Sequence, residues 1–509
     1  MSTERKSIFG RFLRPKPAEQ PAENPDNSQP APGGTPRAAP TITASGLDCS
    51  LLDAEVDDNW TACIDFGTAF SKIVMVRRHE TGATTTEHVR PLQIGPAAMP
   101  GFSPLMCPSA LYVLQERIHF GERAFIVHAN HGASTRQRFE SPKHYISALN
   151  QQLLATPASD AEDPTQRFTR AQLLLLLLGF IIFRFDRALR AEKFPKDRVP
   201  RLRIARPAWK REFEQDGEVL LLDLLARAMI LAREIGERYD TSDGLPVDLA
   251  LSALKAVGKI GEPAANLQAK LIRTATPNDC IERGFVPEAT AVAAAAIRPE
   301  LNKQRVFVIA DIGAGTSDFG AFIAVPGRDR KGRIGEYSKA RRIEERAGNF
   351  LDSQVVSYLI KKNGLNAGLP SDVGTIAALK REARRYKEDL FRDEELDGPL
   401  RGELRELLAE PEMAAFVNEL RGKFGETLHA ACEEAAGLQQ RPPVRVLLTG
   451  GGAELPFVRG LAAAPAQQRV PVIEENPTPP WVVGTNWNVA FRQLAVALGG
   501  AMPSLPEQK

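Results

Sequence analysis

The chain has 509 residues, of which 43% are apolar and 25% are charged, so it exceeds a single hydrophobic core and has the composition of an ordinary globular protein. The net charge of +2 argues against nucleic-acid binding by the whole protein. Five scattered cysteines without a Cys-x-x-Cys pair argue against structural zinc, and with no N-terminal signal sequence they predict a cytoplasmic protein.

Residues 1–46 differ in composition from the rest of the chain. Prolines recur from Pro15 to Pro40 among small and polar residues, so the stretch cannot bury enough apolar surface to fold. We expect a disordered tail. Residues 6–14, KSIFGRFLR, interleave basic and bulky apolar side chains. They are either a solvated part of the tail or a peptide that docks on a partner protein or an anionic membrane surface.

A first folded region is predicted from residue 60 to 300. It begins with Cys63–Val76, CIDFGTAFSKIVMV, which reads as two apolar strands joined by a turn containing Asp65, Gly67 and Thr68. The run Leu173–Phe183 is strongly apolar, but its 11 residues fall short of the roughly 20 that a membrane span needs. We therefore expect a buried helix and no transmembrane segment.

The rest of this region alternates predicted loops, strands and helices. Apolar spacing predicts a helix over 218–235, and the alanine-rich stretch 289–297 predicts a helix whose small residues permit close approach of a neighbour. Exposed loops are expected at 151–168 and 190–200, and strands at 202–205 and 245–251.

A second region is predicted from residue 301 to 485, and it repeats the first design. Val306–Ala324, VFVIADIGAGTSDFGAFIA, reads as strand, turn and strand. The turn has no bulky side chain at 313–315, so its backbone N–H groups can approach an anion closely. The flanking Asp311 and Asp318 suit a hydrated magnesium ion, and Thr316 can donate to a phosphate oxygen. Taken alone, the motif is also compatible with an ordinary glycine-containing hairpin.

The remaining elements follow the second hairpin. We expect a helix at 350–362 and charged helices with a solvated face over 375–440. Val444–Leu461 then reads as strand, Gly450-Gly451-Gly452 turn and helix, an arrangement that suits a phosphate or a nucleoside packed against backbone. A short strand is expected at 471–473 and a last helix within 486–502.

Two Asp-Gly hairpins and a strand–Gly-Gly-Gly–helix together resemble the superfamily of actin, the sugar kinases and the heat-shock protein 70 chaperones. The resemblance implies an α/β fold with two similar lobes, each a five-stranded mixed sheet flanked by helices, with ATP in the cleft. Further segments between residues 60 and 502 resemble heat-shock protein 70. They are Pro108–Val113, Phe120–Ala124, Arg138–Lys143, Ile204–Trp209, Phe285–Ile297 and Arg346–Asp352.

The resemblance also implies roles for individual residues. Lys143 would stabilise charge on the γ-phosphate, and Asp311 or Asp318 would orient the attacking water. Asp65, Glu288 and Asp311 would order the waters of Mg²⁺. The contacts to ATP or ADP would come from Gly67, Thr68, Ala69, Gly313, Ala314, Gly315, Thr316, Lys387, Gly450, Gly451 and Gly452. The sequence departs from the family at Ala314 and Ala289, which replace Gly and Pro, and at Glu454, which replaces an arginine that stacks on adenine.

Three functions are compatible with these motifs. The family-specific segments favour a heat-shock-protein-70-like ATPase that acts as a nucleotide-driven switch on a partner protein. The peptide-binding domain of the chaperones has no counterpart in the sequence, so we expect the nucleotide-binding domain only. An actin-like filament-forming or scaffold protein and a small-molecule kinase are the alternatives.

Overall fold

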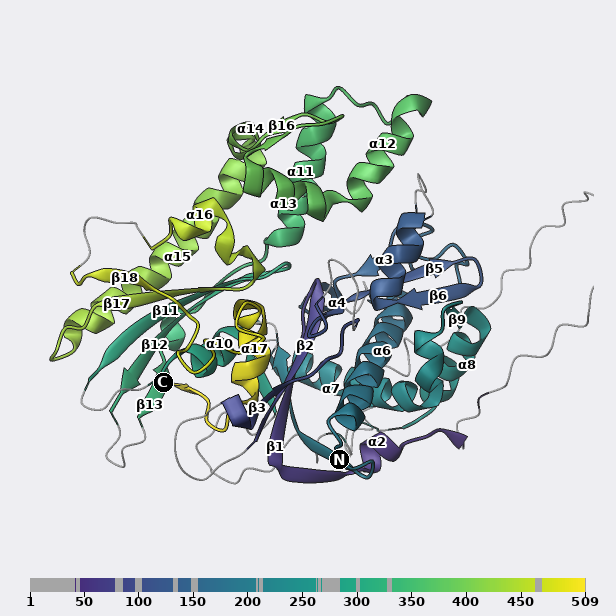
Figure 1. The fold of residues 1–509 in the computed structure, drawn as a ribbon, viewed down its shortest axis with the longest axis horizontal. Coiled ribbons are helices and arrows are strands. Elements are labelled where there is room, and N and C mark those ends of the chain that lie inside the picture. The colour runs from purple at the N-terminus through teal and green to yellow at the C-terminus, as the bar shows by residue number, and fades with distance from the viewer. Residues whose placement is uncertain are drawn as a thin grey trace, which may run out of the picture.

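The structure is a computed structural model in which two mixed β-sheets are flanked by helices (Figure 1). It describes residues 42, 46–77, 86–96, 103–130, 136–147, 154–206, 209, 214–261, 263, 267, 284–298, 303–326, 332–462 and 469–508. The predicted docking peptide 6–14 and nearly all of the predicted tail lie outside the described residues.

The first sheet contains the first predicted hairpin. Its strand order is β10-β8-β1-β2-β3, with β4 also paired to β2. The neighbours β1, β2 and β3 are antiparallel, whereas β8 and β10 continue the sheet in parallel. The strands are β1 (Glu55–Phe66), β2 (Phe70–Arg77), β3 (Val89–Pro91), β4 (Cys107–Pro108), β8 (Arg198–Arg206) and β10 (Phe285–Pro287).

The second sheet repeats this arrangement. Along its path β18-β17-β11-β12-β13, the strands β11, β12 and β13 are antiparallel and β17 and β18 are parallel. Short pairings by β14 and β19 bring this sheet to seven strands, and β4 brings the first to six. The strands are β11 (Arg305–Ile312), β12 (Ser317–Val325), β13 (Arg333–Glu336), β14 (Arg342–Glu344), β17 (Val444–Thr449), β18 (Val472–Glu475) and β19 (Glu507–Gln508).

Successive side chains of a strand point to opposite faces of its sheet, and in both sheets the side chains on both faces are buried. In β1 and β2, Ala62, Ile64 and Ile73 face one core, whereas Cys63 and Val74 face another. The outer face of the first sheet packs on α6 (Arg170–Ala191), α7 (Glu214–Ile235) and α8 (Val247–Val257). The outer face of the second sheet packs mainly on α15 (Pro411–Gly437) and α11 (Gly348–Lys362).

Two helices lie between the sheets. These are α10 (Glu288–Ala296) and α17 (Phe491–Ala501), and both inner sheet faces contribute to their core (Figure 1). The two helices cross so closely that a Cβ added at Gly499 would lie 1.6 Å from the carbonyl oxygen of Ala291. This confirms the prediction that the small residues of 289–297 permit close helix packing.

Smaller elements extend both halves of the molecule. A third sheet, β7-β5-β6-β9, lies beside α3, with α4 following β7 in the chain, and the hairpin β15–β16 lies near α11, α13 and α14. Their bounds are β5 (Ala110–Leu114), β6 (Arg117–Phe120), α3 (Gly121–Asn130), β7 (Phe139–Glu140), α4 (Pro142–Ser147), β9 (Leu245–Pro246), α12 (Pro370–Arg381), α13 (Ala383–Asp393), β15 (Glu395–Leu396), β16 (Gly402–Glu403) and α14 (Leu404–Ala409). Single turns are α2 (Ser50–Asp53), η2 (Thr86–His88), η4 (Gly236–Asp240), η5 (Ser338–Ala340), η6 (Gly451–Glu454) and α16 (Pro456–Arg459).

The leucine-rich run is a buried helix, as predicted. A capping box starts α6: the Thr169 hydroxyl accepts from the Gln172 N–H, and the Gln172 side chain accepts from the Thr169 N–H. All residues from Leu173 to Phe183 are buried. No helix in the described ranges combines the length and apolar character that a membrane span needs.

Four local predictions were wrong in part. The strand predicted at 245–251 ends at Pro246, and α8 follows because Val247, Ala250 and Leu254 recur at helical spacing on its buried side. The loop predicted at 190–200 overlaps both the last residues of α6 and the start of β8 at Arg198. The helix predicted after the glycine turn spans only the four residues of α16.

The loop predicted to be exposed at 151–168 is partly buried in its described portion. Asp163 is fully buried, and its carboxylate accepts hydrogen bonds from the backbone N–H groups of Thr165, Arg167 and Phe168. A buried carboxylate with several N–H donors orders a loop, which composition alone does not reveal.

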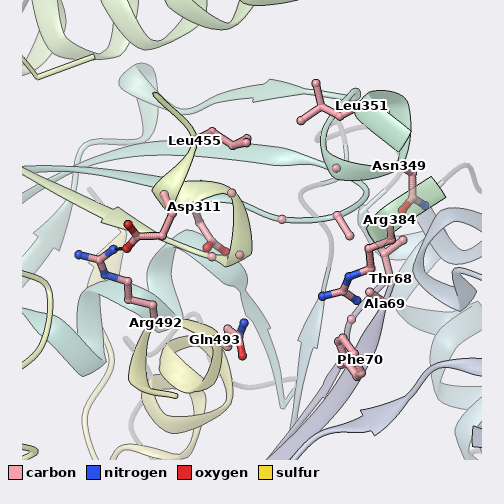
Figure 2. A pocket seen from close by; sticks show the side chains of 18 of the residues that line it. Thr68, Ala69, Phe70, Asp311, Asn349, Leu351, Arg384, Leu455, Arg492 and Gln493 are labelled. Atoms are coloured by element: carbon pink, nitrogen blue, oxygen red, sulfur yellow. Dashed lines mark ion pairs between the residues drawn. The ribbon is translucent and has the colours of Figure 1, made fainter. Parts of the chain in front are cut away.

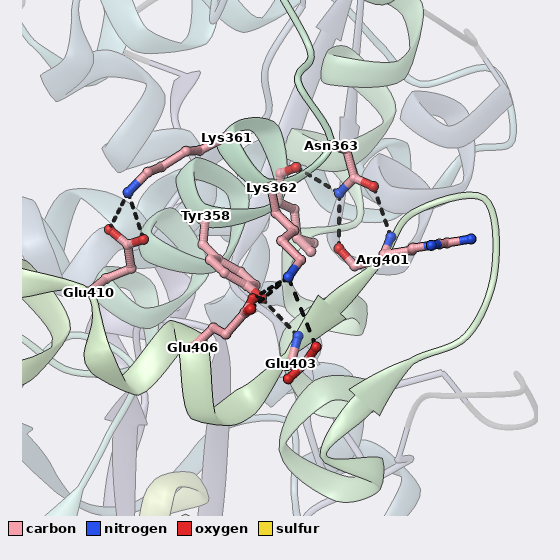
Figure 3. A network of polar contacts seen from close by, with 9 residues as sticks. Tyr358, Lys361, Lys362, Asn363, Arg401, Glu403, Glu406 and Glu410 are labelled. Carbon is pink, nitrogen blue, oxygen red and sulfur yellow. Dashed lines mark hydrogen bonds and ion pairs between the residues drawn. The ribbon is translucent and has the colours of Figure 1, made fainter.

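A polar network fixes α11 on α14 in the second half (Figure 3). The Tyr358 hydroxyl donates to Glu406 at 2.7 Å and accepts from the Glu403 N–H at 2.8 Å. Lys362 pairs with Glu406 at 2.6 Å, and Lys361 pairs with Glu410 at 2.8 Å. Burial raises the pKa of Tyr358 to about 12, so its hydroxyl keeps its proton and remains a donor. The network thereby holds the helix whose first residues, Gly348 and Asn349, border a cavity between the two halves.

Candidate functional site

A cavity of about 820 Å³ lies between the two halves. Both hairpin turns, the starts of α10 and α11, one side of α13, the Gly450–Gly452 turn and α17 contribute to its lining. Figure 2 shows Arg384 reaching over Thr68, Ala69 and Phe70, with Asp311 and Arg492 on the opposite side. Sequence segments that were predicted to bind one ligand therefore meet around one space.

The two hairpin turns face each other across a narrow gap. A Cβ added at Gly315 would lie 2.5 Å from the Thr68 hydroxyl, so glycine allows this approach without displacing that side chain. The Thr68 hydroxyl is buried and forms no hydrogen bond with a described residue. Within the described part of the chain, the backbone N–H groups of Ala314 and Gly315 also find no acceptor. A buried hydroxyl without a partner is costly, and the two N–H groups on the half-buried Ala314 and Gly315 are available to donate, so this gap fits an anionic ligand that accepts from all three.

Acidic and basic side chains gather beneath the turns. The carboxyl groups of Asp65, Glu288, Asp311 and Asp318 are buried there, as is the side chain of Lys143, whereas Lys72 is half-buried. Lys143 lies 2.5 Å from Glu288 and donates to the Thr316 hydroxyl at 3.3 Å. Lys72 pairs with Asp65 at 2.7 Å. Carboxyl groups thus outnumber ammonium groups.

This crowding perturbs proton affinity. Burial raises the pKa of Asp311 to about 6, with a further contribution from Asp318. Burial also raises the pKa of Glu288 despite the adjacent ammonium group. For Lys143, burial lowers the pKa, but Glu288 and Asp318 outweigh burial and raise it overall. Lys143 therefore stays charged, while the carboxyl groups would gain from a cation.

The donor set fits a magnesium ion bound through water better than a direct metal cage. Among the described residues, no three histidine, cysteine or acidic side chains lie close enough together to hold a metal ion directly. The excess of buried carboxyl groups nevertheless favours a cation. Magnesium keeps several of its waters and commonly binds beside phosphates through few carboxylates, so the site is suited to it.

The glycine turn closes one end of the cavity. Gly450 has a φ of +80°, and a Cβ there would lie 2.3 Å from the carbonyl oxygen of Ile312. The turn can therefore pack directly on the end of β11 only with glycine at this position. The Thr449 hydroxyl, just before it, donates to Asp311 at 3.1 Å.

Nearly all the predicted site residues line the cavity. They are Asp65, Gly67, Thr68, Ala69, Lys143, Glu288, Asp311, Gly313, Ala314, Lys387, Gly450, Gly451 and Gly452. The three others lie directly behind the lining: Gly315 contacts Thr68, Thr316 contacts Lys143, and Asp318 accepts from the Thr316 hydroxyl at 2.8 Å. Lys387 lies on α13, where it pairs with Asp352 at 2.7 Å.

Several lining residues were not predicted from the sequence. Lys72 is the cross-strand partner of Asp65, so the register of the first hairpin could have revealed it. Arg384 lies over the Phe70 ring at 4.8 Å, and Arg492 pairs with Glu454. These arginines come from α13 and α17, and no local pattern connects either helix to the hairpins.

Neither the models of known protein families nor the curated protein sequences compared with this chain give a match. The geometry and chemistry of the cavity are therefore what indicate the function.

Proposed function

We propose that this protein binds ATP with Mg²⁺ in the cavity and hydrolyses it slowly to ADP and phosphate, as a conformational switch that acts on a partner protein. We also infer that the two halves are the lobes of an actin-like ATPase fold. The observation that carries the proposal is the pair of facing hairpin turns, whose Thr68 hydroxyl and Ala314 and Gly315 N–H groups have no acceptor among the described residues. The matching five-strand paths of the two sheets support the fold assignment.

Each side of the cavity has a separate role in this proposal. The turns bind the phosphates, and Lys143 stabilises the charge that develops on the terminal phosphate. Asp311, largely ionised at neutral pH, accepts a hydrogen bond from the attacking water and orients it, with Asp318 as its neighbour. A bound magnesium ion would neutralise phosphate charge, and Asp65, Glu288 and Asp311 would hold it through water. Gly450–Gly452 and Lys387 border the space for the nucleoside.

The position of the turns explains how hydrolysis could drive a conformational change. One turn belongs to each sheet, so a triphosphate contacting both stabilises the closed arrangement. Loss of the terminal phosphate weakens this shared contact, and the halves can then separate. A partner that binds one arrangement better would sense the nucleotide.

The decisive experiment compares ATP affinity and turnover in the wild type, Lys143→Met and Lys361→Met. Methionine keeps the length of the lysine stem, and Lys361 is an exposed surface control. Removing the Lys143 ammonium group should lower turnover about 10²- to 10³-fold and change affinity much less. The double variant Lys143→Met/Glu288→Gln serves as a check on folding. It removes both members of the Lys143–Glu288 ion pair, so no unpaired Glu288 carboxylate is left to destabilise the fold. The proposal fails if the wild type does not bind ATP with Mg²⁺, or if Lys143→Met turns over normally.

A further inference from the structure

A second cavity, of about 440 Å³, lies between α12 and the third sheet. One wall comes from α12 and from Ala367 three residues before it, and the other comes from α3 and the segment around β7. In Figure 1, α12 of the second half lies opposite α3 and β5 of the first. The lining residues are His128, Arg136, Gln137, Arg138, Glu140, Ala367, Val373, Ile376, Ala377, Lys380 and Arg381.

Positive charge dominates this cavity. Among the lining residues that the structure describes, the cations Arg136, Arg138, Lys380 and Arg381 face one carboxylate, that of Glu140. Arg138 pairs with that carboxylate and also lies over the Phe125 ring at 4.1 Å, so its guanidinium is held in place. The cavity therefore has a net positive lining and would attract a ligand with several carboxylates.

The α12 wall is also apolar at one end. Its lining residues at 373, 376, 377, 380 and 381 share one helical face, on which apolar side chains precede the two cationic ones. Val373 is 39% exposed, and the preceding Leu369 is 49% exposed. A small inorganic anion would leave this apolar surface uncovered. A peptide that carries both carboxylates and bulky apolar side chains would cover it and match the charge.

Both walls are connected along the chain to residues that line the first cavity. The segment that supplies Arg136, Arg138 and Glu140 runs directly into Ser141 and Lys143. Ser141 has a φ of 64°, a left-handed conformation that costs a non-glycine residue free energy and therefore marks a constrained backbone. Its hydroxyl accepts from the Asn349 side chain at 2.9 Å, across the space between the halves.

The wall formed by α12 is also connected to the first cavity. Glu382 both ends α12 and begins α13, so the two helices are joined without a loop. Arg384 and Lys387 on α13 line the first cavity. A ligand that moves α12 or the segment 136–140 would therefore displace residues that surround the proposed nucleotide.

We propose that the cavity between α12 and β7 binds an acidic segment with bulky apolar side chains from a partner protein, and that its occupancy is coupled to nucleotide binding. The coupling rests on the proposed function, whereas the docking does not. Because coupling between two sites is reciprocal, the segment and the nucleotide change each other's affinity by the same factor.

Docking is tested without nucleotide, by fluorescence anisotropy with a short labelled peptide that alternates glutamate and leucine. Lys380→Glu should weaken binding about tenfold, because it replaces an attraction with a repulsion, and Val373→Asp should do the same at the apolar end. Lys339→Glu, an exposed lysine outside the cavity, should bind as the wild type does. Failure of the wild type to bind, equal binding of a lysine–leucine peptide, or equal effects of Lys380→Glu and Lys339→Glu would overturn the docking proposal.

Coupling is tested by repeating the titration with saturating ATP and Mg²⁺, with ATP binding monitored separately. A change in peptide affinity of about fivefold or more supports coupling. An unchanged peptide affinity while ATP is bound overturns it. If ATP does not bind at all, the proposed function and the coupling both fail, and the nucleotide-free titration alone decides the docking.

Discussion

Replacing Asp311 with asparagine should make the nucleotide-free protein more stable while abolishing ATP turnover. Burial and the nearby Asp318 raise the pKa of Asp311 to about 6, compared with an ordinary value of about 3.9. Ionising this carboxyl therefore costs the folded state about 3 kcal/mol more than it costs the unfolded chain. Asparagine has nearly the same shape, can keep the acceptor for the Thr449 hydroxyl, and carries no charge.

The sign of the pH dependence follows from proton binding. Between pH 4 and 6 the folded wild type holds the Asp311 proton more tightly than the unfolded chain does, so its stability falls as pH rises through this window. The asparagine side chain at position 311 in the variant has no proton to gain or lose in this pH range. The stability difference between the two proteins should therefore be near zero below pH 4 and approach about 3 kcal/mol above pH 6.

Urea unfolding of both proteins from pH 4 to pH 8, without nucleotide, measures this difference. Asp243→Asn, at an exposed loop position, is the matched control and should show no such gain. Adding ATP and Mg²⁺ should stabilise the wild type more than Asp311→Asn, because the variant loses one of the three carboxylates proposed to hold the magnesium ion through water. A variant that is less stable than the wild type at pH 7.5, or a gain that is constant from pH 4 to pH 7, would refute the reasoning.

Two further predictions concern packing around the cavity. Gly315→Ala should place a methyl group against the Thr68 hydroxyl and lower the free energy of unfolding by about 1–3 kcal/mol. It should also weaken ATP binding, as measured by calorimetric titration. The control Gly425→Ala, in an open part of α15, should instead raise the free energy of unfolding by up to about 1 kcal/mol. Tyr358→Phe should lose about 1–2 kcal/mol in urea unfolding, because Glu406 loses a donor and the Glu403 N–H loses its acceptor, yet ATP turnover should not change. A turnover defect in Tyr358→Phe would show that the α11 network reaches the site.

The local patterns predicted the hairpins because each is specified by neighbouring residues. Apolar runs around Asp65 and Asp311, interrupted by small residues, can form little else than two strands and a tight turn. The glycine turn at 450–452 was recognisable for the same reason. By contrast, α8 was misread because a short apolar run such as 245–251 has no length or flanking residue that distinguishes strand from helix.

Residues brought in by tertiary structure could not be predicted in this way. Arg384 and Arg492 reach the cavity only because α13 and α17 pack where they do, and neither carries a local signal. The second cavity is a stronger example, since its two walls come from residues between 128 and 140 and between 367 and 381, which lie far apart in the sequence. Its charge pattern exists only in the folded chain.

The layer formed by α10 and α17 bears on how the chain folds during synthesis. Arg203 in the first sheet donates to the backbone carbonyls of Gly500 and Met502, 297 and 299 residues later. Until α17 has been synthesised, the inner face of the first sheet, including Cys63 and Val74, lacks part of its cover. The nascent chain therefore exposes an apolar sheet face for most of its translation, a state that invites aggregation or chaperone binding. Truncation within α17 should consequently affect the first sheet as severely as the second.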